Sequence, residues 1–394
     1  MKILLVMTPS FDATKGGVQR IVEKIGGYFA SQGHQVYFYS TKNSGHIAPH
    51  YGTLEHAQEP GGPDNAANLT HLRAVLQKYQ PDVVLNEMPY EHGLRRTLKA
   101  AKEELGFLLL GCLNNSLFSV KNNLAKYATE VLPGWAGRLL NNALGHRLLL
   151  AYHKRKHSRD LQAILEDNDL FVLPTASQAN VDELRYFVGD FGADKVAGIP
   201  NSIPGFRLDQ VAKKEKVLLY VGRLNNSQKR SDLLLPVWRE LVDQLPDWKF
   251  EIVGDGPYLQ ELRKQLAKAP VDRVYLRGFQ VPTEYYERAA IFIMPSSYEG
   301  FPSVLLEAQS NGVIPVAFDS YPALSWIVND GQDACLIPAF NTTEMAAAIL
   351  RLAQDEKSRA RMREACRTNA RRFTIDQVGE QWLELFEKYT GELV

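Results

Sequence analysis

The sequence predicts an α/β protein made of two doubly wound, Rossmann-like domains that face a central cleft. Three observations lead to this fold class. The chain has 394 residues, which is too many for one ordinary core and enough for two. Short apolar runs alternate with longer helical patterns, which is typical of parallel strands covered on both faces. The runs form two sets, one in each half of the chain, so we expect two separate sheets.

Continuous apolar runs bounded by turn residues mark the expected strands. They are residues 2–7, 35–40, 82–87, 107–113 and 170–174 in the first half, and residues 216–222, 249–254, 273–278, 291–296, 313–318 and 334–338 in the second.

The expected domain boundary lies where the composition changes. Residues 198–216 combine prolines, glycines and a charged end, which is typical of a linker before a new strand. We therefore expect a first domain over residues 1–200 and a second over residues 201–373. Residues 374–394 carry apolar side chains at helical spacing, so we expect a closing helix that packs back toward the first domain.

Composition excludes several classes of protein. Lys and Arg number 45 and so do Asp and Glu, and this balance argues against a nucleic-acid partner, which demands a basic surplus. Cys112, Cys335 and Cys366 are too few for a disulfide framework, and their spacing fits no zinc motif. The first apolar run ends at Pro9 and is interpreted as a buried strand rather than a signal peptide. We expect a cytoplasmic protein.

The stretch PSSYEGFPSVLLEAQSNG, residues 295–312, follows an apolar run and holds two carboxylates. Pro302 suits the first position of a helix, where the amides of residues 303–305 would lack partners and form an anion site suited to phosphate. Glu307 would share the face of those amides and accept hydrogen bonds from hydroxyls, as on a ribose. Glu299 would lie nearer a second hydroxylated group. The alternative is a helix-start acid that favours the dipole, plus a solvated loop acid.

A second strand end carries cations. Arg223 follows the strand 216–222 directly and Lys229 lies six residues further on. Together they could neutralise a diphosphate without a metal, although a solvated charged loop is the alternative. Gly254 opens a Gly-Asp-Gly turn that would permit close approach of a ligand. Phe279 follows another strand, where its backbone could contact a base or its ring could belong to the core.

Paired glycines mark the start of the first domain. Gly16 and Gly17 lie between the first expected strand and a helix, where the backbone could approach a phosphate or sugar closely.

Taken in order, these motifs resemble the retaining glycosyltransferases of the GT-B fold, family 4 (glycosyl transferases group 1). The resemblance covers nearly the whole chain. It is carried by GGVQRIVEKIGGYFASQGHQV, IPNSIP, VGRLNNSQK, EIVGDGP, EGFPSVLLEA and the closing helix. Glu299 and Glu307 match the family's E-x7-E motif.

The resemblance implies roles for the residues already named. Arg223 and Lys229 would bind the diphosphate of a nucleotide-sugar donor, Glu299 would contact the donor sugar, and Glu307 would hold the ribose. The backbone of the segment Phe301, Pro302, Ser303 and Val304 would offer amides to the donor. The first domain would bind the acceptor and the second the nucleotide-sugar.

The implied reaction is transfer of a hexosyl or N-acetylhexosaminyl group from a UDP- or GDP-sugar to a hydroxyl of a glycan or lipid-linked acceptor, with retention of configuration. The departing diphosphate would help to take the acceptor's proton, so the reaction would require no metal and no cofactor. Bacterial surface polysaccharide or lipopolysaccharide synthesis is the setting that the resemblance implies.

The chain departs from the family where many relatives carry a histidine that faces the acceptor. Asn114 and Asn115 stand there, and asparagine can position a hydroxyl but cannot act as a general base. His92 is an alternative base, or simply a surface histidine. The departure also leaves open a non-catalytic sugar-nucleotide-binding subunit. An NAD-dependent oxidoreductase lacks support, because the glycine fingerprint is missing after the first strand.

Two further segments have competing interpretations. Residues 116–160 are basic and rich in leucine and aromatic residues, so they could lie on the inner face of an anionic membrane, or form a helix pair packed on the sheet. The Asp-Asn-Asp run at 167–169 could suggest a metal site, but it precedes a strand rather than following one. We interpret it as a polar turn and expect no metal.

Overall fold

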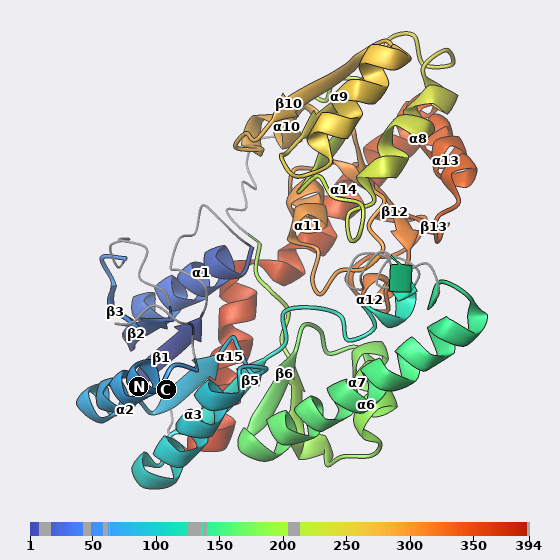
Figure 1. Cartoon of the computed structure of the whole chain (residues 1–394). Coiled ribbons are helices and arrows are strands. Elements are labelled where there is room, and N and C mark those ends of the chain that lie inside the picture. Colours follow the sequence, from blue (N-terminus) through green and yellow to red (C-terminus); the bar gives the residue numbers. More distant parts are fainter. Residues whose placement is uncertain are drawn as a thin grey trace. The chain divides into compact units, whose positions relative to one another are not determined.

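The computed structural model describes residues 1–7, 17–41, 49–57, 62, 64–124, 135–136, 140–203 and 213–391. The chain divides into two compact units, each with its own sheet (Figure 1). The first unit comprises Met1–Asn115, Ala151–Pro204 and Phe373–Val394. The second comprises Ser116–Leu150 and Gly205–Arg372, so residues 116–150 group with the C-terminal sheet rather than with the expected domain 1–200.

The described part of the first unit contains a seven-stranded parallel sheet in the order β3-β2-β1-β4-β5-β6-β7. Its strands are β1 (Lys2–Met7), β2 (Gln35–Ser40), β3 (Gly52–His56), β4 (Val83–Asn86), β5 (Leu108–Cys112), β6 (Leu170–Leu173) and β7 (Val196–Gly198). The associated helices are α1 (Gly17–Ser31), α2 (Ala66–Tyr79), α3 (His92–Leu105), α7 (Gln178–Val188) and α15 (Ile375–Thr390), with a 3-10 turn η2 (Ala193–Lys195). Helix α6 (Ala143–Asp167) belongs to this unit from Ala151 on, and its first residues, up to Leu150, group with the second unit.

Helices cover both faces of this sheet because successive strand residues point to opposite sides. Ile3 and Leu5 of β1 belong to a buried cluster with apolar residues of α1 and α15, whereas Leu4 belongs to a cluster with those of α2 and α3. The rings of Phe29 in α1 and Phe386 in α15 have centroids 5.4 Å apart. The C-terminal helix, red in Figure 1, therefore completes the core of the unit that holds the N-terminal strands.

The described part of the second unit contains a six-stranded parallel sheet in the order β10-β9-β8-β11-β12-β13. Its strands are β8 (Val217–Val221), β9 (Lys249–Val253), β10 (Val274–Gly278), β11 (Ile291–Met294), β12 (Ile314–Asp319) and β13 (Cys335–Pro338). The helical segments are η1 (Lys121–Asn123), η3 (Ser231–Leu233), α8 (Leu234–Leu241), α9 (Leu259–Lys268), α10 (Thr283–Arg288), α11 (Ser303–Ser310), α12 (Leu324–Ile327), α13 (Thr342–Gln354), α14 (Glu356–Ala370) and η4 (Arg371–Phe373).

The second sheet is also covered on both faces. Trp238 of α8 is fully buried against Phe250 of β9, in a cluster that includes residues of α9, α13 and α14. On the opposite face, Tyr286 of α10 contacts the ring of Phe292 in β11. The prediction of two doubly wound α/β domains is confirmed.

Each sheet has one place where the strand order reverses. This switch point lies between β1 and β4 in the first sheet and between β8 and β11 in the second. The loops that leave neighbouring strands diverge there, so the carboxyl ends of these strands are the usual ligand sites in open α/β sheets.

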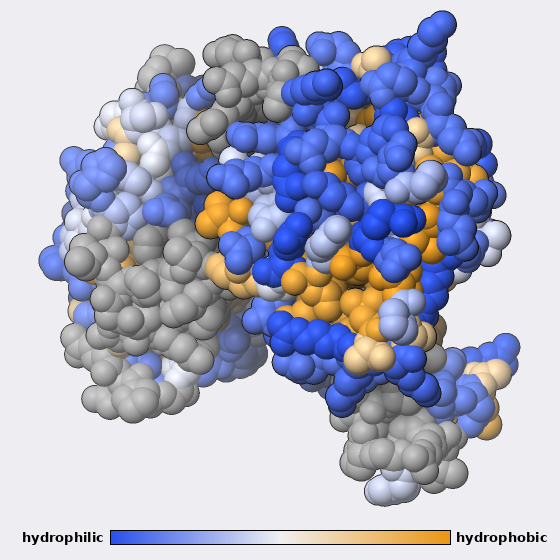
Figure 2. Space-filling view, turned by 90° about the horizontal axis from the view of Figure 1, so that it is seen from above, coloured by the Kyte–Doolittle hydropathy of each residue, from blue (hydrophilic) through white to orange (hydrophobic). Residues whose placement is uncertain are grey.

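The surface is mixed in character. In the view of Figure 2, hydrophilic residues predominate and the hydrophobic residues that reach the surface gather in separate areas. Exposed large apolar side chains include Leu144, Leu148 and Tyr152 of α6 and Phe279 and Val281 after β10. Among the helices of the described residues, none is both long enough and apolar enough to span a membrane.

Replacing Phe386 by alanine tests the packing of α15. We expect Phe386→Ala to lower the free energy of unfolding by about 3–5 kcal/mol, because the variant leaves a cavity beside Phe29 and Trp382. Urea unfolding followed by circular dichroism measures the change, and Glu384→Ala on the exposed side of the same helix is the control. A loss below about 1 kcal/mol would contradict the described packing.

Candidate functional site

An ion pair occupies the switch point of the second sheet. Lys229 Nζ donates to Glu299 Oε1 at 2.6 Å, and the two side chains are only 16% and 7% exposed. Lys229 lies in the loop after β8 and Glu299 in the loop after β11, so the pair joins the two strand ends across the switch point. Gln228 Nε2 donates to the other carboxylate oxygen at 3.0 Å. The interpretation of Glu299 as a solvated loop acid is therefore wrong.

The loop after β8 is held by its own asparagine. Asn225 Oδ1 accepts the backbone amides of Gln228 and Lys229 at 3.1 and 2.9 Å, which is the side-chain turn that asparagine favours. The Ser297 amide donates to the Gln228 carbonyl at 2.7 Å and ties this loop to the one after β11. The ion pair thus rests on backbone that local hydrogen bonds already fix.

Arg223 has a different environment. Its side chain is exposed and makes no ion pair with any residue that the structure describes. Its backbone is held, because Tyr220 Oη donates to the Arg223 carbonyl at 3.0 Å. The same strand end therefore presents one cation that is already paired, Lys229, and one that is available to a ligand.

The start of α11 differs from the expectation. Pro302 precedes the first helical residue instead of occupying it. The Ser303 amide donates to the Phe301 carbonyl and the Leu305 amide to the Pro302 carbonyl, each at 3.0 Å. The prediction that all three amides are unpaired is wrong for these two, because a tight turn at the proline satisfies them locally. The Val304 amide donates to no residue in the described ranges, so one donor remains for an anion.

Glu307 lies in the middle of α11 and is buried, as Glu299 is. Burying a carboxylate costs free energy unless hydrogen bonds or an opposite charge compensate it. Glu299 and Glu307 are both buried near the start of α11. Their burial favours a functional site over the alternative interpretation, in which an acid near the helix start only stabilises the helix dipole.

Buried hydroxyls surround the ion pair, and the sequence reasoning missed them. The hydroxyl oxygens of Ser296, Ser297 and Tyr321 are buried and have no hydrogen-bond partner among the described residues. Burial raises the pKa of the Tyr321 hydroxyl well above its ordinary value, and the negative charges of Glu299 and Asp319 raise it further. Unsatisfied polar atoms of this kind are few in folded proteins, and each calls for an explanation such as a bound ligand or an ordered water.

Gly254 and Phe279 are the other two residues of the second unit predicted to contact the donor. A Cβ atom at Gly254 would lie 1.9 Å from the carbonyl oxygen of Gly222, so this glycine is required by the close approach of the chain to itself. Phe279 is 71% exposed, and the interpretation of its ring as core is wrong. Contact of either residue with a donor stays a prediction.

The residues predicted for the first unit separate in the structure. Gly16 lies outside the described residues, and Gly17 is the first residue of α1. Asn115 is exposed. His92 is exposed at the start of α3, with Nδ1 3.1 Å from Nη2 of Arg95. His92 does not line the pocket that contains Asn114. This position favours the interpretation of His92 as a surface histidine.

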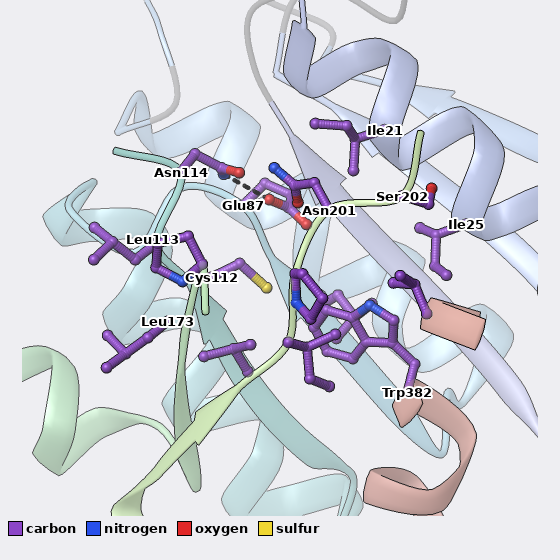
Figure 3. Close-up of a pocket in the computed structure, with 16 residues that line it drawn as sticks. Ile21, Ile25, Glu87, Cys112, Leu113, Asn114, Leu173, Asn201, Ser202 and Trp382 are labelled. Atoms are coloured by element: carbon purple, nitrogen blue, oxygen red, sulfur yellow. Dashed lines mark hydrogen bonds between the residues drawn. The ribbon is translucent and has the colours of Figure 1, made fainter. Parts of the chain in front are cut away.

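That pocket lies at the carboxyl ends of strands β4 to β7 (Figure 3). It is lined by Ile21, Ile25, Leu85, Glu87, Cys112, Leu113, Asn114, Val172, Leu173, Pro174, Ile199, Pro200, Asn201, Ser202, Val378 and Trp382. Asn114 Nδ2 donates to Glu87 Oε2 at 2.7 Å. Sequence reasoning missed Glu87, although a carboxylate directly after a buried strand at the switch point was the available signal.

The Asp-Asn-Asp run has structural partners. Asp167 accepts from Arg95 Nε at 2.7 Å and from Lys99 Nζ at 2.9 Å. Asp169 pairs with Lys102 and accepts the Leu109 amide, and these bonds tie α6 and β6 to α3 and β5. Within the described ranges, no cluster of His, Cys, Asp and Glu has the arrangement needed to hold a metal ion.

Comparison with known proteins identifies the second unit. Residues 207–369 match the family described as glycosyl transferases group 1, so this part of the chain contains a domain of that family. An exopolysaccharide phosphotransferase of Streptomyces coelicolor is 35% identical over 198 residues, which cover 49% of this chain and 21% of that protein. An uncharacterized glycosyltransferase of Haemophilus influenzae is 32% identical over 197 residues, which cover 49% of this chain and 55% of that protein. The chain thus spans between about a fifth and about half of the length of these relatives.

Solved structures extend the likeness to the whole fold. The HepE protein of Anabaena in complex with UDP and glucose superimposes with a TM-score of 0.71 at 16% identity, covering 98% of this chain and 100% of that one. The two parallel-sheet α/β units are those of GT-B glycosyltransferase structures, which confirms the predicted fold class.

Removing the cation from the ion pair tests its structural role. We expect Lys229→Met to lower the free energy of unfolding by about 2–4 kcal/mol, because the buried Glu299 loses its opposite charge and keeps only the Gln228 bond. Urea unfolding measures the loss, and the exposed Arg223→Met is the matched control. The double variant Lys229→Met/Glu299→Gln should recover at least half of the lost free energy of unfolding, because it also removes the buried negative charge. A double variant as unstable as Lys229→Met would show that the two charges are not coupled.

Proposed function

We propose that the chain is a retaining glycosyltransferase that transfers a sugar from a UDP- or GDP-sugar to a hydroxyl of a glycan or lipid-linked acceptor. One observation carries the proposal. The buried Lys229–Glu299 pair and the exposed Arg223 meet at the switch point of the sheet whose sequence matches glycosyl transferases group 1. The fold alone would not suffice, because one fold hosts many functions.

The chemistry of the site suits a nucleotide diphosphate. Arg223 offers a guanidinium group that can bind two phosphate oxygens. Lys229 uses one of its three N–H donors on Glu299, so the other two would remain for phosphate. The free Val304 amide adds a donor at a helix start. Glu299 and Glu307 supply acceptors for the hydroxyls of the donor sugar and of the ribose. The UDP and glucose of the structurally similar HepE complex support a donor of this class.

The proposed mechanism is a displacement on one face of the sugar, so configuration is retained. The acceptor oxygen forms a bond to the anomeric carbon while the bond from that carbon to the diphosphate breaks. The diphosphate leaves with the electron pair and takes the hydroxyl proton, so charge grows on its oxygens in the transition state. Arg223, Lys229 and the Val304 amide would stabilise this charge, which is usually the largest catalytic contribution. These groups would perform the task that a metal ion performs elsewhere, and we propose a reaction without metal or cofactor.

The proposed setting is bacterial surface polysaccharide or lipopolysaccharide synthesis. The exopolysaccharide named for the Streptomyces relative supports it. A surface of α6 supports contact with a membrane that carries a lipid-linked acceptor. Leu144, Leu148 and Tyr152 are 67%, 59% and 65% exposed at a spacing of four residues, which places them on one helix face. Arg147 and Arg155 are also exposed there, so an anionic bilayer on the cytoplasmic side would suit this face.

A second candidate is a non-catalytic subunit that binds a sugar nucleotide. Asn114 favours it, because an asparagine stands where many members of the resembled family carry a histidine. Turnover of a sugar nucleotide by the purified protein separates the two candidates.

Nucleotide binding tests the proposed donor site. We expect UDP, GDP or one of their sugars to raise the melting temperature, because a ligand that binds only the folded state stabilises it. We expect Arg223→Ala to raise the dissociation constant about tenfold without changing the melting temperature of the free protein. Calorimetric titration measures the affinity, with Arg263→Ala, an exposed arginine of α9, as the control. Equal affinities for the two variants would remove Arg223 from the site.

Vesicle sedimentation tests the proposed membrane face. We expect binding to phosphatidylglycerol vesicles, weaker binding in high salt, and little binding to phosphatidylcholine vesicles. The triple variant Leu144→Ser/Leu148→Ser/Tyr152→Ser should bind at least about tenfold more weakly, because it loses the apolar contact. The matched control, Tyr275→Ser/Phe279→Ser/Val281→Ser, removes exposed apolar residues of β10 and of the loop that follows it. Equal loss in both variants would argue against a specific α6 surface.

A further inference from the structure

Two bulky residues near the proposed donor site adopt a backbone conformation that favours glycine. Arg230, which follows Lys229 directly, has a φ angle of 50°, and Phe340, in the loop after β13, has a φ angle of 66°. A residue with a side chain is strained in this left-handed region, because its Cβ atom approaches a backbone carbonyl oxygen, whereas glycine is not. Such strain persists only where the surrounding structure imposes it, and it is typical of functional sites.

The two strained residues contact each other. The guanidinium carbon of Arg230 lies 4.9 Å from the centre of the Phe340 ring, a distance at which a cation is attracted to the face of an aromatic ring. We call this contact the Arg230–Phe340 stack. The Phe340 ring also contacts the ring of Phe318 in β12, with centroids 5.8 Å apart. Because β11 and β12 lie between β8 and β13 in the sheet, the stack joins two loops that leave the carboxyl edge of the sheet on either side of those strands.

An ion pair holds the guanidinium group of Arg230 in place. Its Nε and Nη2 atoms donate to the two carboxylate oxygens of Asp232 at 3.0 and 2.9 Å. The Asp232 amide in turn donates to Asn226 Oδ1 at 3.2 Å. A guanidinium group that is bonded along one edge keeps its flat face for an aromatic ring. The orientation of Arg230 is therefore fixed by Asp232 along its edge and by Phe340 on its face.

The backbone on both sides of Lys229 is fixed by hydrogen bonds. Before it, Asn225 Oδ1 accepts the Lys229 amide at 2.9 Å. After it, the chain turns through the left-handed conformation of Arg230, and the Ser231 amide donates to the Asn225 carbonyl at 3.0 Å. The loop thus closes on itself around Lys229. The Arg230–Phe340 stack connects this closed loop to the loop after β13.

Packing alone does not explain the presence of Phe340. Its side chain is 39% exposed, so it buries less apolar surface than a core residue does, and glycine would remove the strain at this position. Gln80 adopts the same conformation at the end of α2, where termination of the helix explains it. Phe340 ends no helix, and its contact with Arg230 places it one residue from a proposed ligand of the diphosphate. A fixed backbone there lowers the entropy cost of ordering Lys229 when an anion binds.

We propose that Arg230 and Phe340 are positioning residues for the diphosphate of the donor, and that they act by fixing the backbone of Lys229. The proposal rests on the glycosyltransferase function above. Lys229 Nζ keeps its bond to Glu299 and directs its other two N–H donors at the diphosphate oxygens. Arg230 spends its guanidinium edge on Asp232, so it serves the diphosphate through Lys229 and not by direct contact.

The experiment compares Phe340→Leu and Phe340→Tyr with the wild type. Both variants keep a side chain at the left-handed position, but only tyrosine keeps an aromatic face for Arg230. The probe is UDP or GDP, whichever the wild type binds more tightly by calorimetry, with the matching monophosphate as the reference. We expect Phe340→Leu to raise the dissociation constant of the diphosphate about fivefold, in line with the loss of one cation–π contact, and that of the monophosphate less. Phe340→Tyr should match the wild type within about twofold.

A double-mutant cycle distinguishes the positioning of Lys229 from a general effect on the fold. Because Phe340 acts through Lys229, adding Phe340→Leu to Lys229→Met should change the affinity for the diphosphate by less than about twofold. An equal loss in both backgrounds, or no loss in Phe340→Leu alone, would overturn the proposal and leave the transferase function standing. A wild type that binds neither nucleotide and turns over no sugar nucleotide would instead overturn the proposed function and this inference with it.

Glycine at position 340 separates affinity from stability. Phe340→Gly removes both the stack and the strain, so it should melt at a temperature at least as high as Phe340→Leu while binding the diphosphate no more tightly. Gln80→Gly, the matched control, relieves the same strain in the first unit and should lower neither the melting temperature nor the affinity. A Phe340→Gly variant that binds the diphosphate as tightly as the wild type would overturn the proposal.

Discussion

The parallel direction of the strands is the constraint on which both sites depend. Strands buried on two faces leave their polar loops only at the ends of the sheet, and those loops diverge where the strand order reverses. The Lys229–Glu299 pair lies at this point in the second sheet, and Glu87 lies there in the first. The topology that builds the two cores thus also places these charged side chains in loops at the switch point of each sheet, outside the apolar core.

The continuous apolar runs predicted every described strand except β3 and β7, because burial on both faces leaves a clear signal in the sequence. These two strands form the edges of the first sheet and are only partly buried. β3 has the sequence GTLEH, whose polar residues tolerate an edge, and β7 has only three residues. The grouping of 116–150 with the second unit was equally inaccessible, since it depends on contacts far apart in the chain.

Sequence reasoning selected the residues of the proposed donor site but did not predict how they pair. It placed Lys229 and Glu299 at two strand ends and assigned them to different parts of a ligand, which stays a prediction, but it did not predict the ion pair that they form across 70 residues of sequence. It overestimated the free amides of α11, because a proline can precede a helix and close a turn that satisfies them. It missed Glu87, although a carboxylate directly after a buried strand was a signal in the sequence, because the hydrogen bond to Asn114, 27 residues later, is evident only in the fold.

The contrast between the two carboxylates decides what each can do. Glu299 already binds an ammonium group, so its charge is balanced and its oxygens are suited to receive hydrogen bonds from sugar hydroxyls. Glu87 has an amide and a thiol as partners, and burial raises its pKa, so it retains a high affinity for a proton. The uncharged Asn114 amide preserves this difference between the two carboxylates, because a cation beside Glu87 would lower the pKa of its carboxyl group.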